Sequence, residues 1–80
     1  MTREEVYSRL KNVFEDVFEF EVDLNDNTTS ADVPGWDSLA HITLMVGIGS
    51  EFKIKLPMSE VVHLRNVGEM VTLIMKHMQK

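Results

Sequence analysis

The amino-acid sequence predicts an all-α fold: a small four-helix bundle with three longer helices, one short helix and a long loop between helix 1 and helix 2. Apolar residues recur at helical spacing in three separate segments, and no segment shows the alternation of a half-buried strand. Residue patterns typical of helix N-termini precede these segments. The length of 80 residues suits one domain, so we expect a single domain over residues 1–80.

The first helix is predicted from about residue 3 to about residue 17. Thr2 is followed three residues later by Glu5, which is the form of a capping box. The apolar residues behind it lie on one helical face; they are Val6, Leu10, Val13, Phe14 and Val17.

Residues 19–37 show no sustained period and read as a long loop. A loop of this length in a small domain is usually functional or held in place. The apolar residues expected to hold it against the core are Phe20, Val22, Leu24 and Val33.

The second helix is expected to begin at Asp37 or Ser38, either of which is a good N-cap, and to end near Phe52. Its apolar residues occupy more than one face, so the helix is either central or offers an apolar face to a partner. A short helical turn is expected after Pro57, extending to about residue 63. Asn66 with Glu69 predicts the start of a last helix over about residues 67–78.

The net charge of −5 is uneven: residues 1–38 carry −7 and residues 39–80 carry +2. An acidic chain is a poor partner for nucleic acid and for anionic membranes, whereas a basic patch on another protein suits it. No cysteine is present, which excludes disulfides and thiolate metal sites. No apolar run approaches the ~20 residues of a membrane span, so we expect a cytoplasmic protein.

Ser38 stands where the loop becomes a helix, and three roles are open to it. A hydrolase nucleophile needs an oriented base; His41 lies one helical turn away, but nothing in the sequence orients it. The serine can instead be an N-cap. It can also be a site of covalent attachment, because a phosphate at a helix N-terminus meets free amides and the positive end of the helix dipole.

No metal site is expected. Asp23, Asn25 and Asn27 resemble the opening of a calcium loop, but the later positions that need glycine and glutamate hold Thr28 and Pro34. The histidines share no ligand spacing. Five internal methionines are either core residues or the lining of an adaptable cavity: Met45, Met58, Met70, Met75 and Met78.

The segment Gly35-Trp36-Asp37-Ser38-Leu39 resembles the signature of acyl carrier proteins, a family that includes the carrier domains of fatty acid, polyketide and nonribosomal peptide synthesis. In that family, Asp-Ser-Leu follows a glycine-containing turn and begins the second helix. The resemblance continues through "EFKIKLP" (51–57) and "NVGEMVTLI" (66–74), and it covers about residues 4–78.

The resemblance implies a carrier and not an enzyme. It implies that Ser38 holds 4′-phosphopantetheine, which a separate phosphopantetheinyl transferase takes from coenzyme A, and that Asp37 and Leu39 are recognition residues beside it. The thiol of this arm holds acyl groups as thioesters for acyl-loading, ketosynthase or transferase-type enzymes. We also expect a monomer.

The resemblance further implies that an acyl chain can lie between the helices, although the same residues can form a plain core. The expected cleft residues are Ile42, Val46, Ile48, Val61, Leu64, Val67, Val71 and Ile74.

The chain departs from the family pattern on its second helix. Carriers of fatty acid synthesis usually present acids there, and this chain has instead Ala40, Thr43, Gly49 and Ser50. We therefore expect a carrier in a specialised pathway whose docking is more apolar. The expected partner-binding residues are Trp36, Leu39, Met45, Val46, Glu51 and Glu60. The alternative is a small helical interaction module in which Ser38 is only an N-cap.

Overall fold

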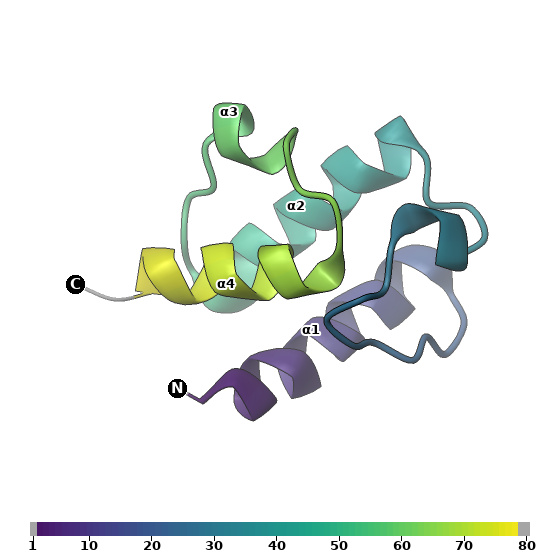
Figure 1. Cartoon of the computed structure of the whole chain (residues 1–80), viewed down its shortest axis with the longest axis horizontal. Coiled ribbons are helices and arrows are strands. Elements are labelled where there is room, and N and C mark those ends of the chain that lie inside the picture. Colours follow the sequence, from purple (N-terminus) through teal and green to yellow (C-terminus); the bar gives the residue numbers. More distant parts are fainter. Residues whose placement is uncertain (1, 79–80) are drawn as a thin grey trace.

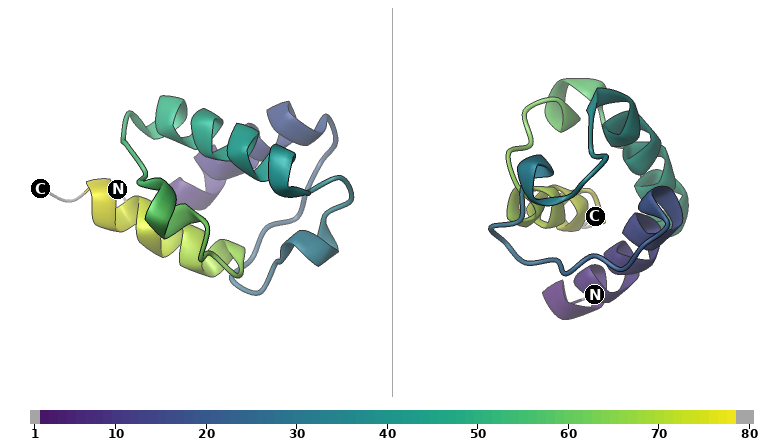
Figure 2. Two further views of the ribbon diagram at one scale, coloured as in Figure 1. Left: turned by 90° about the horizontal axis from the view of Figure 1, so that it is seen from above. Right: turned by 90° about the vertical axis from the view of Figure 1, so that its right-hand side faces the viewer.

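The computed structural model describes residues 2–78, and in this range the chain forms four α-helices and one 3₁₀ turn. The elements are α1 (Arg3–Phe18), the 3₁₀ turn η1 (Ser30–Asp32), α2 (Ser38–Phe52), α3 (Met58–Val61) and α4 (Val67–Met78). Residues 2–78 contain no strand, so the predicted all-α bundle is confirmed. The start of α1 and the end of α4 lie at one end of the bundle, and the α1–α2 connection lies at the other (Figure 1 and Figure 2).

The predicted helix starts are confirmed by their capping contacts. The Glu5 amide donates to the Thr2 hydroxyl at 3.2 Å, and the Glu5 carboxylate accepts from the Thr2 amide at 3.3 Å. At α4, the Asn66 side chain accepts from the Glu69 amide at 2.8 Å. The first helix runs to Phe18, one residue further than predicted, and ends where Glu19 adopts a left-handed φ of 62°.

The short helix α3 ends at Val61 and does not extend to residue 63. The amides of His63 and Leu64 bond to carbonyls only three residues back, which is the pattern of a turn. In the α1–α2 connection, Val22 and Val33 are buried as predicted and Leu24 is half-buried. The prediction for Phe20 was wrong: its side chain is 42% exposed, because it follows the end of α1, where its ring packs against that of Phe18 with 6.1 Å between the centroids.

The core lies between α1, α2 and α4, with buried residues also from the long connection and α3. Full burial of one large aliphatic side chain stabilises a fold by about 1.5–3 kcal/mol. None of the helices within residues 2–78 is both long and apolar enough to cross a membrane. The largest side chains that are fully enclosed are Phe14, Leu10, Leu44, Ile48, Met70 and Ile74.

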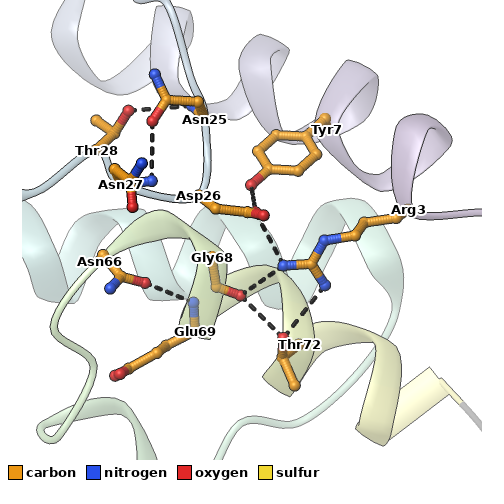
Figure 3. A network of polar contacts seen from close by, with 10 residues as sticks. All are labelled: Arg3, Tyr7, Asn25, Asp26, Asn27, Thr28, Asn66, Gly68, Glu69 and Thr72. Carbon is orange, nitrogen blue, oxygen red and sulfur yellow. Dashed lines mark hydrogen bonds and ion pairs between the residues drawn. The ribbon is translucent and has the colours of Figure 1, made fainter.

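A polar network anchors the long connection to the starts of α1 and α4 (Figure 3). The Arg3 guanidinium donates to the Asp26 carboxylate at 2.9 Å, to the Gly68 carbonyl at 3.1 Å and to the Thr72 hydroxyl at 3.2 Å. The Tyr7 hydroxyl donates to the same carboxylate, and these bonds lower the pKa of Asp26. Gly68 is needed here because a Cβ at this position would lie 2.8 Å from the Asp26 carbonyl oxygen. The network therefore holds the connection that leads to α2.

Candidate functional site

Ser38 is the first residue of α2, and it is exposed. The N-cap is Asp37, whose carboxylate accepts from the Ala40 amide at 2.8 Å. The sequence did not decide whether Asp37 or Ser38 is the N-cap, and the structure assigns the cap to Asp37. The Ser38 hydroxyl is therefore not required for capping, and the interaction-module alternative loses its explanation for this serine.

The turn before Ser38 depends on Gly35, whose φ of 88° lies in the left-handed region that favours glycine. The Trp36 amide donates to the Val33 carbonyl at 3.2 Å, and the Asp37 amide donates to the Gly35 carbonyl at 3.0 Å. These short-range bonds bring the chain from the long connection directly into α2. They place Ser38 at the N-terminal end of α2.

The start of α2 suits an anionic group. The amides of the first turn have no acceptor within a helix, and the Asp37 carboxylate engages that of Ala40. The amides of Ser38 and Leu39 are therefore directed toward the helix N-terminus, where the dipole places partial positive charge. A phosphate on the Ser38 hydroxyl would meet both.

Trp36 was expected on the partner-binding surface, but its ring is half-buried against α1. Its centroid lies 5.3 Å from that of Phe14 in an edge-to-face arrangement and 6.2 Å from that of Phe18. Such aromatic pairs stabilise a core beyond their buried area. Most of the Trp36 side chain therefore packs within the bundle.

His41 is oriented by two hydrogen bonds that sequence reasoning missed. The Trp36 indole nitrogen lies 3.1 Å from Nδ1, and the Val61 carbonyl oxygen lies 3.0 Å from Nε2. Both ring nitrogens are engaged, so neither is placed to take a proton from Ser38. The geometry gives no support to a serine nucleophile activated by this histidine.

A pocket of about 460 Å³ opens beside Ser38, with lining residues from η1, the turn before α2, α2, α3, the segment that joins α3 to α4, and α4. This volume lies in the usual range for small-molecule sites. Of the expected cleft residues, Ile42, Val61 and Leu64 line it. The others lie elsewhere: Ile48, Val67, Val71 and Ile74 are in the core, and Val46 is exposed.

Three methionines that line the pocket were absent from the expected cleft: Met45, Met58 and Met70. Their flexible side chains adapt to irregular spaces. The sequence signal was the methionine content, which favoured core residues and left the lining of an adaptable cavity as the alternative. Only the tertiary structure shows that Met45 of α2, Met58 of α3 and Met70 of α4 line the same pocket.

The exposed apolar face of α2 differs from the expected one. Leu39 is 73% exposed and Val46 is 69% exposed, and Ile42 is also exposed between them. Met45 was expected on this face, but it is only 8% exposed because it lies on the side of α2 that packs into the core. Met58 of α3 and Val62, which follows its last residue, add exposed apolar surface.

The two acids expected to bind partners are paired within the chain. Glu51 accepts from the Arg9 guanidinium at 2.8 Å. Glu60 lies 2.7 Å from His77 and 3.5 Å from the Lys76 ammonium. The hydrogen bond with His77, followed by the charge of Lys76, lowers the pKa of the Glu60 carboxyl.

No group of three or more His, Asp or Glu side chains in the described range is placed to hold a metal ion. The polar residues of the calcium-like stretch serve the turn: the Asn25 side chain accepts from the Asn27 amide at 2.8 Å, and the Thr28 hydroxyl accepts from the Asn25 amide at 3.0 Å.

Comparison with known proteins identifies the family. The family model described as "Phosphopantetheine attachment site" matches residues 8–74. The chain belongs to the acyl carrier protein family. An acyl carrier protein of Lactobacillus acidophilus is 27% identical over 78 residues, which is 96% of this chain and 98% of the relative. The solution structure of a holo acyl carrier protein from Geobacter metallireducens superimposes with a TM-score of 0.83 at 33% identity, covering 90% of this chain and 84% of that one.

Members of this family are carriers and not enzymes, and they act together with partner enzymes. Their cofactor is covalently attached phosphopantetheine. The expected family and cofactor are therefore confirmed.

Proposed function

We propose that Ser38 carries the 4′-phosphopantetheine arm. The observation that supports this most is the division of labour at the start of α2: Asp37 caps the helix and leaves an exposed serine hydroxyl beside it. The amides of Ser38 and Leu39 suit the phosphate of the arm. Because the chain has no cysteine, the thiol that forms acyl thioesters comes from the arm.

Intact mass after incubation with coenzyme A and a broad-specificity phosphopantetheinyl transferase tests this assignment. Wild type is expected to gain one phosphopantetheine, and Ser38→Ala is expected to gain none. Ser50→Ala is the matched control, because Ser50 is exposed near the other end of α2. Modification of Ser38→Ala, or loss of modification in Ser50→Ala, would move the attachment site elsewhere.

We propose that the pocket beside Ser38 receives the apolar part of the carried group. Its lining residues include the apolar side chains of Ile42, Met45 and Met70 together with Ser38. A chain that enters replaces contacts between the pocket walls with contacts of its own. With an isotope-labelled octanoyl group on the arm, we expect NMR contacts from the chain to the methyls of Met45 and Met70, and none to Leu39. Contacts to Leu39 alone would place the chain outside the bundle.

We propose that partner enzymes dock on the exposed apolar face of Leu39, Ile42 and Val46. The acids Glu51 and Glu60 are already paired with cations of this chain, which leaves them less available to a basic partner. Val46→Glu is expected to raise the KM of the transferase at least tenfold, with the thermal midpoint unchanged because the side chain is exposed. Glu51→Gln is expected to change this KM less than twofold. A larger change in KM for Glu51→Gln than for Val46→Glu would show that partners dock on the acidic residues instead.

The apolar docking face also supports a dedicated role in a specialised fatty acid, polyketide or nonribosomal peptide type of pathway. Acids that usually mark α2 in carriers of fatty acid synthesis are replaced by Ala40, Thr43, Gly49 and Ser50. A monomeric state and a cytoplasmic location stay predictions.

A further inference from the structure

The two partners of His41 determine its proton. An indole nitrogen can only donate and a carbonyl oxygen can only accept. The Trp36 N–H therefore donates to Nδ1 at 3.1 Å, and Nε2 must carry the hydrogen that it donates to the Val61 carbonyl at 3.0 Å. Both bonds exist together only when the imidazole is neutral.

These two bonds, together with the packing of Trp36, connect three helices. Trp36 packs against Phe14 and Phe18 of α1, and its ring lies within 16° of the plane of the His41 ring, as a hydrogen bond between their in-plane nitrogens requires. His41 belongs to α2, and Val61 is the last residue of α3. The bonds therefore tie the segment just before Ser38 to the end of α3.

The bridge lies at the pocket. Trp36, His41 and Val61 all line it, as does Ser38. α3 is only four residues long, so few other contacts hold it: the buried Val61 side chain, and the contacts of Glu60 with Lys76 and His77 on α4. Within residues 2–78, the bond between His41 and Val61 is the only hydrogen bond that joins α2 to α3.

We propose that His41 is a latch that holds α3 against α2 and thereby controls the opening of the pocket beside Ser38. The latch is closed when the imidazole is neutral. Protonation opens it because a second N–H then opposes the Trp36 N–H, so that the ring turns away from Trp36 and carries Nε2 away from the Val61 carbonyl. A chain entering the pocket opens it by separating the same partners. This extends the proposed function, since it assigns the residue that admits the carried group.

The charged groups around His41 do not replace the hydrogen bond with Trp36 that protonation removes. Asp37 at the start of α2 and Arg65 from the α3–α4 segment line the same pocket with opposite charges. Glu60 on α3 is engaged by His77 and Lys76. On the side of α1, the rings of Phe14 and Phe18 lie against Trp36.

Amide hydrogen exchange on the unloaded protein tests the latch without any attached group. The amides of Val61, Val62 and Leu64 report on α3, and buried α1 amides report on the whole fold. At pH 8, His41→Leu is expected to speed exchange of the α3 amides by about five- to thirtyfold, the factor that one or two ordinary hydrogen bonds supply. The control His63→Leu, at an exposed histidine just after α3, is expected to leave them unchanged.

The pH dependence separates a latch from a merely structural histidine. After correction for intrinsic rates, the wild-type α3 amides are expected to exchange faster at pH 5 than at pH 8, and those of His41→Leu are expected to show no such change. Trp36→Phe keeps the aromatic packing but removes the opposing N–H. We expect α3 in this variant to stay protected at both pH values, because a protonated His41 can still donate to Val61.

Equal α3 exchange in wild type and His41→Leu would overturn the proposal, and so would nitrogen chemical shifts showing Nδ1 protonated at pH 8. A failure of Ser38 to accept the arm, measured by mass, would leave these results untouched and would count only against the proposed function. Where loading succeeds, an octanoyl group on Ser38 is expected to shift the Trp36 indole signal and to speed exchange in α3. An unchanged indole signal would remove the role of His41 in admitting the group.

Discussion

At the start of α2, capping the helix and carrying the arm are assigned to two neighbouring residues, Asp37 and Ser38, so the two roles can be tested separately. Asp37 makes the capping bond to the Ala40 amide at 2.8 Å, and Ser38 does not. Replacement of an N-cap by alanine costs about 0.5–2 kcal/mol, typically ~1. For a domain of this size, ~1 kcal/mol corresponds to a midpoint shift of about 4–8 °C. We therefore expect Asp37→Ala to lower the thermal midpoint by this amount.

Ser38→Ala is expected to change the free energy of unfolding by less than about 0.5 kcal/mol, because the side chain is exposed and alanine suits a helix. Asp37→Asn is the control, since its amide oxygen can still accept from Ala40. Thermal unfolding followed by circular dichroism measures all three variants on the unloaded protein. If Ser38→Ala lowered the midpoint as much as Asp37→Ala, the serine would be the cap and the argument for its availability would fail.

Three further predictions concern the polar contacts. Gly68→Ala is expected to destabilise the fold by about 1–3 kcal/mol in denaturant unfolding, since its Cβ would meet the Asp26 backbone; an unchanged midpoint would show that the connection shifts freely. The pKa of Glu60 is lowered below its ordinary value of 4.5 by His77, so its contribution to stability is present above that pH and is lost as the pH falls through the lowered value. Glu60→Gln should therefore flatten the acid limb of a stability–pH curve, and an unchanged limb would contradict the pairing. Burial, followed by the bond to Asp26, raises the pKa of Tyr7 to about 12; as the only tyrosine, it should show a tyrosinate absorbance titration at that pH when folded and near 10.0 when unfolded.

Much of the fold follows from local sequence signals. The capping box at Thr2 and Glu5 and the Asn66 cap act over three residues, and they located two helix starts. The position of Ser38 at the beginning of α2 followed in the same way from the turn at Gly35 and the polar pair that follows it. The end of α1, the end of α3 and the exposed Phe20 departed from these expectations.

The faces of α2 could not be predicted in this way. Its apolar residues surround the helix, so periodicity does not distinguish the side that packs on the core from the side that meets solvent. Packing of α2 into the core placed Met45 inside and left Val46 outside. The pairing of Arg9 with Glu51 joins residues far apart in the chain, and no pattern within α2 indicates it.

The sequence by itself determined the helices, the exposed serine and the family, because caps, periodicity and the Asp-Ser-Leu signature act between neighbouring residues. Only the tertiary structure decided that Asp37 is the cap, that methionines line the pocket and that His41 joins Trp36 to Val61. The physical reason is that these contacts depend on how helices distant in sequence pack against one another. That packing selects one set of side-chain neighbours among several that the sequence allows.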